Sequence, residues 1–385
     1  MQTKFLSDNE YVRNYKLAVI IILAAIFTSF LIGCNEEPPV ASEPDVEESY
    51  LQPDEALVEI DKVNQEMTNN LAKGNRHHKF VVLPAGSEDA LSDAVKKAGT
   101  GGTVLVKAGL HKESGTVTIS QQVTILGEHG AVFEIDTQPE TVTGKVDPAI
   151  HILNTRKVVL WGIEINPVAV SGGTAILIQD APQCILAKNT LNGHQYGVIL
   201  ENGDRSILWK NSVTNTTAWQ TGAIPFVMGL VNVNGEKVSV IENDLSSGFL
   251  GAFMCDKGGL FYGNNLHENF IGLLVCKVPE NNFTLPDGSM TGAHVSGTHW
   301  LVKGNSAIDN LDTGYLVIDG ANNNLLIKNH AANNGTYDIE LAGESERFGF
   351  YTPTSFENKV FIRNPNLVVK DCGVDNMVRG GSLVD

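Results

Sequence analysis

The residues best placed to do chemistry recur at one position, five residues after a repeated glycine or alanine. A lysine amine can act as a general base, and carboxylate and amide oxygens are the ligands that Ca²⁺ prefers. The pattern therefore predicts Lys277 or Lys257 as a base, and calcium as the one cofactor it suggests. Asp and Asn are also frequent turn residues, so a structural role is the alternative. The column contains Asp180, Asn202, Asn234, Asp256, Lys277 and Asp319, of which Asp180, Asp256 and Asp319 are the candidate metal ligands.

Four aromatic side chains are candidates for stacking on sugar rings, because an aromatic face suits the apolar face of a pyranose. They are Trp209, Trp219, Tyr262 and Trp300. Trp219 lies in an insertion at 214–226, and a second insertion spans 278–298. Long loops on a rigid scaffold often carry function. The alternative is that these rings pack against the scaffold.

The elements that must position these residues follow from a repeated phrase, first seen as ILAKNTLNGHQYGVIL at 185–200. Its anchoring asparagines are 23, 22, 32, 21, 41, 24 and 35 residues apart, which gives a period near 22 with insertions. Each unit holds apolar runs of strand length. Such a unit fits one coil of a parallel β-helix, whose coils stack about 4.8 Å apart. The anchors are Asn166, Asn189, Asn211, Asn243, Asn264, Asn305, Asn329 and Asn364.

Asparagine at the anchor has a physical reason. Every coil places equivalent residues above one another, so a tight corner must repeat a turn-forming residue. Asn tolerates the left-handed conformation, and stacked amides can hydrogen-bond from coil to coil. The repeated phrase therefore describes architecture.

A helix is expected before the first coil. In SEDALSDAVKKAG, residues 87–99, Ser87 is the predicted N-cap, Leu91, Ala94, Val95 and Ala98 share one face, and Gly99 ends the helix. Such a helix would cover the apolar end of the array. Together with GTVLVKAGLH and VTILGE, this arrangement resembles the pectin-lyase-like superfamily, specifically bacterial parallel β-helix repeat proteins, over about residues 79–370. The expected fold is all-β, a single-stranded right-handed parallel β-helix of roughly ten to twelve coils with an N-terminal capping helix.

The resemblance implies a polysaccharide ligand without fixing an activity, because the superfamily holds lyases, epimerases, polygalacturonases and non-catalytic binding proteins. The polygalacturonase motifs are not reproduced, and Asp147-Pro148 is followed by Ala149 where an epimerase would have His. A cell-surface carbohydrate-binding or adhesion protein is therefore the favoured function. The alternative is a calcium-dependent polysaccharide lyase that cleaves uronate-containing chains by β-elimination.

The first residues predict export. Lys4, Arg13 and Lys16 precede an apolar run from Leu17 to Leu31 that is short for a membrane span. Leu31-Ile32-Gly33-Cys34 resembles the bacterial lipobox, which implies cleavage before Cys34 and its lipidation. We expect an outer-membrane lipoprotein that contacts the membrane through its lipid anchor only.

Charge excludes one class of partner. Without the leader the chain has 24 basic and 42 acidic side chains, a net charge of −18. Nucleic acid is excluded, because its binding needs Lys and Arg to neutralise phosphates. An acidic polysaccharide would need a metal ion or a local basic patch.

The predicted organisation has four parts. They are a lipoprotein signal peptide at 1–33, an acidic tether with a short helix at 34–78, the β-helix at 79–370 and a C-terminal tail at 371–385. The segment 35–60 holds nine carboxylates and four prolines, so we expect it to stay unfolded.

The remaining cysteines are Cys184, Cys255, Cys276 and Cys372. A chain of this size needs no disulfide framework, so they are expected to be small buried apolar residues. Cys255 and Cys276 share one column in consecutive coils, with Cα atoms expected about 4.8 Å apart. We predict two buried thiols in contact in the interior and not a disulfide.

Overall fold

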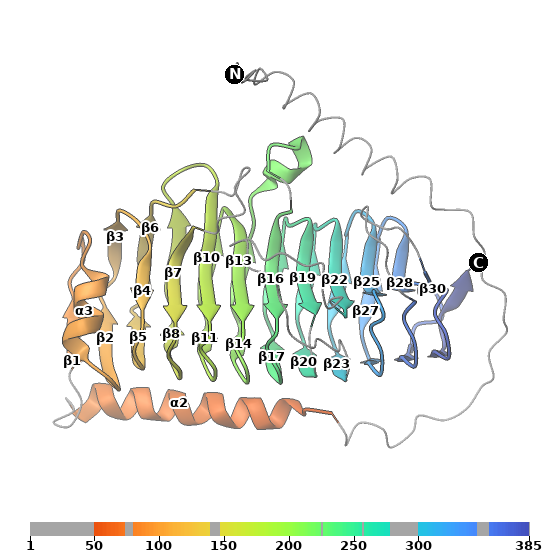
Figure 1. Ribbon diagram of the computed structural model, residues 1–385, viewed down its shortest axis with the longest axis horizontal. Coiled ribbons are helices and arrows are strands. Elements are labelled where there is room, and N and C mark those ends of the chain that lie inside the picture. Colours follow the sequence, from red (N-terminus) through yellow and green to blue (C-terminus); the bar gives the residue numbers. More distant parts are fainter. Residues whose placement is uncertain are drawn as a thin grey trace, which may run out of the picture.

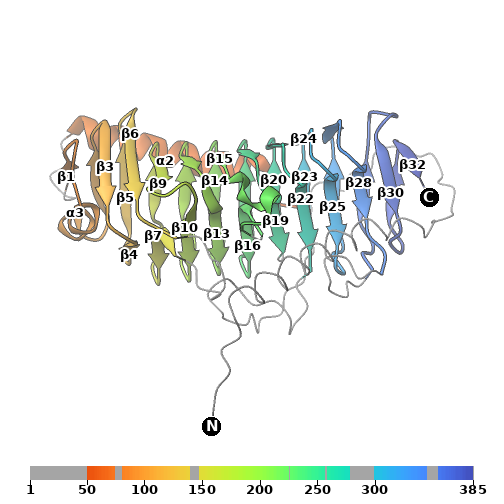
Figure 2. The ribbon, with the colours of Figure 1, turned by 90° about the horizontal axis from the view of Figure 1, so that it is seen from above.

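The computed structural model describes residues 50–73, 80–138, 147–224, 226–255, 258–277, 299–344 and 354–384. These residues form one elongated right-handed parallel β-helix, in which every strand pairing is parallel (Figures 1 and 2). Three long sheets run along its axis, and each coil passes in turn through sheet C, sheet A and sheet B. The predicted fold class is confirmed.

Sheet A has twelve strands within the described residues: β1 (Phe80–Leu83), β2 (Gly102–Val106), β5 (Val123–Gly127), β8 (Val159–Trp161), β11 (Ile185–Ala187), β14 (Ile207–Trp209), β17 (Val238–Ile241), β20 (Gly259–Tyr262), β23 (Trp300–Lys303), β26 (Leu325–Ile327), β29 (Lys359–Phe361) and β31 (Met377–Arg379). Sheet B has nine: β3 (Gly109–Glu113), β6 (Ala131–Ile135), β9 (Glu164–Pro167), β12 (Thr190–Asn192), β15 (Ser212–Thr214), β18 (Asp244–Ser246), β21 (Asn265–His267), β24 (Ser306–Ile308) and β27 (His330–Ala332). Sheet C has eleven: β4 (Val117–Ile119), β7 (Pro148–Leu153), β10 (Gly172–Gln179), β13 (His194–Glu201), β16 (Met228–Val233), β19 (Leu250–Cys255), β22 (Ile271–Cys276), β25 (Thr313–Ile318), β28 (Tyr337–Leu341), β30 (Val368–Asp371) and β32 (Ser382–Val384).

The interior is a continuous stack of apolar side chains. For the six anchors from Asn189 to Asn329, the residues three before them, such as Leu186 and Leu208, and those two after them, such as Leu191 and Val213, are buried in one core cluster. Parallel pairing keeps each of these columns in register, for example Leu186 with Leu208 and Leu191 with Val213. The repeated phrase therefore specifies which residues point inward.

Asparagine side chains join the coils at the corner between sheets A and B. In each step the amide nitrogen of one Asn donates to the amide oxygen of the next at 2.9–3.0 Å. That oxygen also accepts the backbone N–H of the first Asn. Asn166 lies outside this ladder, because Ile163 occupies the position before the strand that pairs with β12. Asn364 also lies outside it, because the pairing of β26 with β29 makes Arg363 the equivalent of Asn329. The ladder consists of Asn189, Asn211, Asn243, Asn264, Asn305 and Asn329.

The other two corners carry shorter ladders of the same kind. Asn269, Asn310 and Asn334 stack between sheets B and C. Asn324, Asn358 and Asn376 stack between sheets C and A. Each corner of the β-helix is therefore fixed by amide hydrogen bonds over several coils.

The N-terminal end is covered by helix α3 (Leu91–Ala98), which buries the four predicted apolar residues and ends at Gly99 (Figure 1). The predicted N-cap is wrong, because Ser87 bonds to the Pro84 carbonyl and the helix begins at Leu91. Glu113, on β3, caps it instead: one carboxylate oxygen accepts the N–H groups of Ala90 and Leu91. A residue distant in sequence thus replaces the local cap.

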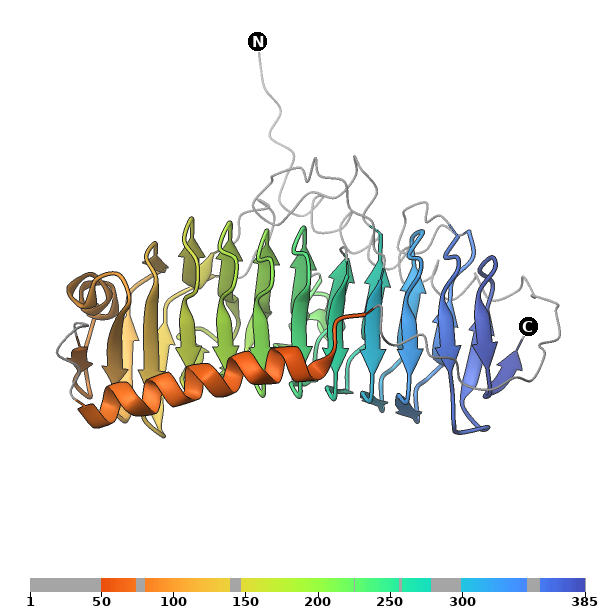
Figure 3. The same ribbon diagram turned by 90° about the horizontal axis from the view of Figure 1, so that it is seen from below.

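Helix α2 (Pro53–Lys73) corrects the expectation for the acidic segment. It has 21 residues and runs along sheet A, crossing its strands (Figure 3). Ala56, Ile60 and Met67 are buried against the outward side chains of that sheet, so residues 53–60 are folded and not part of an extended tether. None of the described helices is long and apolar enough to cross a membrane.

The C-terminal boundary also moves. Strands β31 and β32 lie in the predicted tail, yet they extend sheets A and C in register. The β-helix therefore continues to Val384 and does not end at 370.

Cys255 and Cys276 form a disulfide, so the prediction of two free thiols is wrong. Their Cα atoms are 4.6 Å apart, close to the expected value and within the range that a disulfide spans. The column also faces outward and not into the interior, since both residues belong to an apolar cluster on the outer face of sheet C. This explains why the polar residues Gln179 and Glu201 occupy the same column. Cys184 is a buried free thiol.

Replacing Asn243 by Ala should destabilise the fold strongly. Its amide donates to the Leu208 carbonyl and to Asn264, and its oxygen accepts two bonds from Asn211. Leaving these buried groups unpaired should lower the free energy of unfolding by about 3 kcal/mol. Asn265→Ala, which removes a half-buried amide from the surface, should cost about 0.5 kcal/mol. Urea unfolding followed by circular dichroism compares them, and equal midpoints would contradict the structural role of the ladder.

Peptide mapping tests the disulfide. After alkylation in denaturant without reductant, the peptides that contain Cys255 and Cys276 should be linked. Cys184 should be alkylated only in denaturant, because burial raises the pKa of its thiol to about 11. Separate alkylated peptides at 255 and 276 would restore the free-thiol prediction.

Candidate functional site

The outer faces of the three sheets differ sharply in polarity. Sheet A presents an apolar face that includes Ile185, Ile207 and Leu260 and packs against α2. Sheet C presents an apolar face that includes Ile199, Phe253 and Leu274, all buried. The outward side chains of sheet B are mostly polar, and most of them are half-buried or exposed. A polar ligand would therefore find its partners on sheet B.

We define the polar strip as the polar outward residues of six consecutive strands, β9, β12, β15, β18, β21 and β24. In these strands the central residue is buried and most of its neighbours are at least partly exposed. At one coil per strand the strip spans about 24 Å. Its residues are Glu164, Asn166, Thr190, Asn192, Ser212, Thr214, Asp244, Ser246, Asn265, His267 and Ser306.

Hydrogen bonds between neighbouring coils orient two groups within the polar strip. Asn166 and Asn192 form one group with Glu164, in which Asn166 donates to the carboxylate at 2.8 Å. In the other, Asp244 accepts the Asn265 amide at 2.8 Å, and the same oxygen lies 3.1 Å from Nε2 of His267. Because Glu164 and Asp244 each accept hydrogen bonds from neighbouring side chains, their carboxylates are held in fixed positions on the surface.

An aromatic cluster borders the polar strip at the corner between sheets B and C. Phe249 and Phe270 follow β18 and β21 and stack with centroids 5.0 Å apart. Trp219, on the 3₁₀ helix η2 (Thr217–Thr221), packs edge-on against both rings, and its indole N–H donates to the Ser247 carbonyl. Phe226 packs edge-on against Phe249, remains 43% exposed and has φ of 49°. A bulky residue in the left-handed region is unusual and often marks a functional position.

The other three predicted aromatic residues lie elsewhere. Trp300 is 0% exposed and belongs to the interior, so it has no face to offer a sugar. Trp209 and Tyr262 lie in the apolar cluster beneath α2, where Trp209 contacts Trp161. Lys188 and Lys210 lie over the Trp209 ring at 5.1 and 4.8 Å. Of the four, only Trp219 lies beside the polar strip.

The predicted column of chemistry forms the turns that leave sheet C. Asp180, Asn202, Asn234 and Asp319 have φ between 50° and 60°, the left-handed conformation of a tight turn. Asn202 donates to the Asp180 carboxylate at 2.7 Å, and Lys277 donates its backbone N–H to the Asp319 carbonyl. The stacking is therefore as predicted, and the backbone supports the turn role.

Two features of this column bear on catalysis. Burial raises the pKa of Asp319 to about 7, while the Lys277 charge acts in the opposite direction. Within the ranges that the structure covers, no three His, Cys, Asp or Glu side chains gather as a possible metal site. Asp256 and Lys257, predicted as ligand and base, lie outside the described residues, as does Cys34.

The sequence carried a signal for the polar strip. Each ladder asparagine is followed by a short strand whose middle residue is apolar and whose first residue is polar, as in TLN, SVT, DLS and NLH. This alternation places the first and third residues on the outer face. This alternation can be recognised only when the coils are aligned in the correct register. Taking Asn166 as an anchor shifts its coil by three residues relative to the others.

Comparison with known proteins supports the architecture. No protein-family model and no curated protein sequence matches the chain. Among solved structures, the A-module of mannuronan C-5 epimerase AlgE4 from Azotobacter vinelandii is similar with a TM-score of 0.51 at 14% identity, over 78% of this chain and 94% of that one. The tailspike protein of Escherichia coli bacteriophage HK620, solved with a pentasaccharide, gives 0.47 at 13% identity over 77% and 60%. Polygalacturonase from Erwinia carotovora gives 0.46 at 11% identity over 79% and 96%. The likeness to the epimerase module therefore supports the right-handed parallel β-helix fold that the strand pairings show.

Proposed function

We propose that this protein is a cell-surface lipoprotein that binds carbohydrate through the polar strip and the adjoining aromatic cluster. The observation that carries the proposal is the polarity of sheet B, whose outer face offers amide, hydroxyl and carboxylate groups beside half-exposed aromatic rings. Oligosaccharides present both hydroxyl groups and apolar ring faces. The two surfaces together match that chemistry.

The polar strip supplies donors and acceptors at regular intervals. Its side chains repeat once per coil, about every 4.8 Å along the axis. Asp244 and Glu164 keep acceptor capacity beyond the bonds they make to Asn265 and Asn166, because an ionised carboxylate can accept about four hydrogen bonds. A linear ligand that lies along the axis would meet the same kinds of group in successive coils.

The aromatic cluster supplies the apolar contact. Phe249, Phe270 and Trp219 are buried against one another on part of their surface, which fixes their orientation without a ligand. Phe226 is the most exposed of the described members. Preorganised rings lose little conformational freedom on binding, which favours affinity.

The fold likeness supports the ligand class. The epimerase module named above, which shares the fold, is named for a polysaccharide, mannuronan. At 14% identity it says nothing about which residues act. The proposal for this chain therefore depends on its own surface.

The lipid anchor and location rest on the leader sequence. Residues 1–33 would be the signal peptide, Cys34 would carry the lipid, and the outer membrane would hold the protein. All of these residues lie outside the described ranges. The acidic residues that follow Cys34 support export to the cell surface.

A calcium-dependent polysaccharide lyase is the second candidate. One observation favours it: Lys277 and Asp319 occupy consecutive positions of one column, and the pKa of Asp319 is raised to about 7, a value suited to proton transfer. The turn conformation of the column and the incomplete enzyme motifs favour binding without cleavage.

Phe226→Ala should weaken glycan binding about tenfold, because it removes the exposed ring of the cluster. Phe80→Ala is the matched control, since Phe80 is 37% exposed on β1, away from the strip. Asn265→Ala should also weaken binding, by several-fold, through loss of a polar partner. A glycan array identifies the ligand, and calorimetry with the best hit measures the three variants.

Equal affinities for Phe226→Ala, Phe80→Ala and wild type would refute this binding surface. The same incubation tests the second candidate through absorbance near 235 nm with alginate, pectate and glycosaminoglycans, with and without calcium. Growth of that signal, and its loss in Lys277→Ala, would replace binding by lyase activity.

Cys34→Ala should release the protein from membranes. Because the anchor would be lost, the variant should appear in the soluble fraction after alkaline extraction, while wild type stays with the membrane. A serine substitution at Cys184, which is buried, is the control for general effects of cysteine loss. Retention of Cys34→Ala in the membrane would contradict the lipoprotein assignment.

A further inference from the structure

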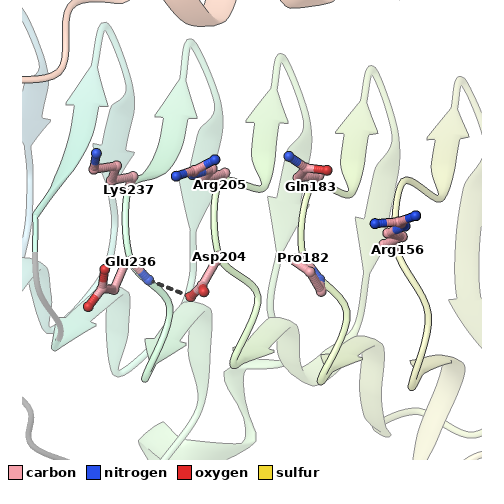
Figure 4. A pocket seen from close by; sticks show the side chains of 7 residues that line it. All are labelled: Arg156, Pro182, Gln183, Asp204, Arg205, Glu236 and Lys237. Atoms are coloured by element: carbon pink, nitrogen blue, oxygen red, sulfur yellow. Dashed lines mark hydrogen bonds between the residues drawn. The ribbon is translucent and has the colours of Figure 1, made fainter.

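The geometry points to a second binding site, for an oligosaccharide that carries sulfate or carboxylate groups, at the turns between sheets C and A. We define the cationic row as Arg156, Arg205 and Lys237, which lie on these turns in successive parts of the β-helix (Figure 4). They border a depression of about 360 Å³, whose other lining residues are Pro182, Gln183, Asp204 and Glu236. The anion-binding property rests on these residues alone, and only the sugar nature of the ligand rests on the proposed function.

The backbone gives the row a fixed spacing. Lys157, Gln183, Arg205 and Lys237 are equivalent turn residues with φ between 54° and 61°. The backbone N–H of each donates to a carbonyl of the next coil, for example Arg205 to Glu236 at 2.8 Å and Gln183 to Asp204 at 2.7 Å. Arg205 and Lys237 are therefore mounted on a stack of bonded turns, and Arg156 directly precedes the equivalent residue Lys157.

The cations of the row differ from four other surface lysines, which have acidic partners. Lys107 and Lys210 form ion pairs with Glu128 and Glu242, while Lys62 and Lys96 each contact an acidic residue one helical turn away. No ion pair within the described residues involves Arg156, Arg205 or Lys237. Arg205 and Lys237 lie in adjacent coils and repel one another, and an anionic ligand would relieve that repulsion.

The lining of the depression keeps a net positive charge, because three cations face two carboxylates. One oxygen of Asp204 accepts the backbone N–H of Glu236 at 2.9 Å, which holds the turn (Figure 4). In Figure 4 Asp204 and Glu236 lie in one line, and Lys237, Arg205 and Gln183 lie in another. Arg156 directly precedes Lys157, the residue equivalent to Gln183, so it lies at the end of the row in the column of Asp204 and Glu236. The ligand would therefore contact Lys237 and Arg205 along their line and reach Arg156 at its end.

The spacing indicates a ligand with more than one charge. Arg156 and Arg205 are two coils apart, about 10 Å, and Lys237 is one further coil away, about 4.8 Å. Guanidinium groups bind sulfate and carboxylate oxygens through paired N–H donors. In a chain of net charge −17, acidic glycans are repelled elsewhere, so this row would also decide where they dock. Three cations are few for a nucleic-acid surface.

The test uses full-length protein and three tetrasaccharides: one from heparin, one from polygalacturonate and one neutral, from dextran. The triple variant Arg156→Gln, Arg205→Gln, Lys237→Gln should lose at least tenfold in affinity for the anionic probes. The control triple Lys62→Gln, Lys96→Gln, Lys97→Gln makes the same change in net charge away from the row and should lose less than twofold. Wild-type binding should weaken as NaCl rises from 50 to 500 mM.

Each outcome separates this site from the polar strip. If the triple variant of the row loses affinity for the anionic probes but binds the array hit as wild type does, a second site is supported. This outcome does not depend on whether Phe226→Ala weakens binding of the array hit. Equal losses in both triple variants would show unspecific charge attraction and overturn the inference. Failure of wild type to bind either anionic probe at millimolar concentration would overturn it as well. Preference for the heparin or the polygalacturonate probe assigns sulfate or carboxylate as the anion.

Discussion

Hydrogen bonds between stacked asparagine amides set the geometry on which the rest of the structure depends. At the corner between sheets A and B, each amide nitrogen donates to the amide oxygen of the asparagine in the next coil. The same nitrogen also donates to a backbone carbonyl of a sheet A strand. A buried amide left unpaired is costly, so a slip by one residue between coils is strongly disfavoured. Fixed coil register, in turn, places each outward side chain directly above its equivalent in the coil before.

Because the coils stack in register, a residue pattern that repeats in each coil forms a continuous surface along the β-helix. The polar outward residues of the short sheet B strands become the polar strip, and Arg205 and Lys237, at equivalent positions of the sheet C to A turns, become adjacent members of the cationic row. The apolar outward residues of sheet A become a stripe that α2 covers, with Ile60 1% exposed against it. Because the scaffold is rigid, ligand selectivity would depend on side chains along these columns and not on rearrangement of the coils.

Much of the fold could be predicted from the sequence, because a repeat states the same inward residues many times. The core columns follow from offsets relative to the anchors, the stacked column from Asp180 to Asp319 from offsets relative to the repeated glycine or alanine, and the capping face of α3 from its helical periodicity. Properties that depend on contacts between distant segments could not be predicted this way. Three examples are the capping of α3 by Glu113, the packing of α2 on sheet A and the outward direction of Cys255. Each depends on residues that are distant in sequence, so the local pattern does not predict it.

The candidate site was predictable only in part, for a related reason. Trp219 was identified as an aromatic in an insertion, but its partners Phe249 and Phe270 come from two other coils. Trp300 has the same side chain as Trp219 and lies in the interior, since position within the coil, and not residue type, decides exposure. A sequence gives the residue types, whereas the coil register decides which of them share a surface.

A crystal structure with the best glycan-array hit is the most direct test of whether the polar strip and the aromatic cluster bind carbohydrate. We predict an intact oligosaccharide along the outer face of sheet B, with a sugar ring against Phe226 and hydroxyl groups hydrogen-bonded near Asp244 and Asn265. A ligand bound at the turns around Lys277 and Asp319, or a cleaved chain there, would contradict it.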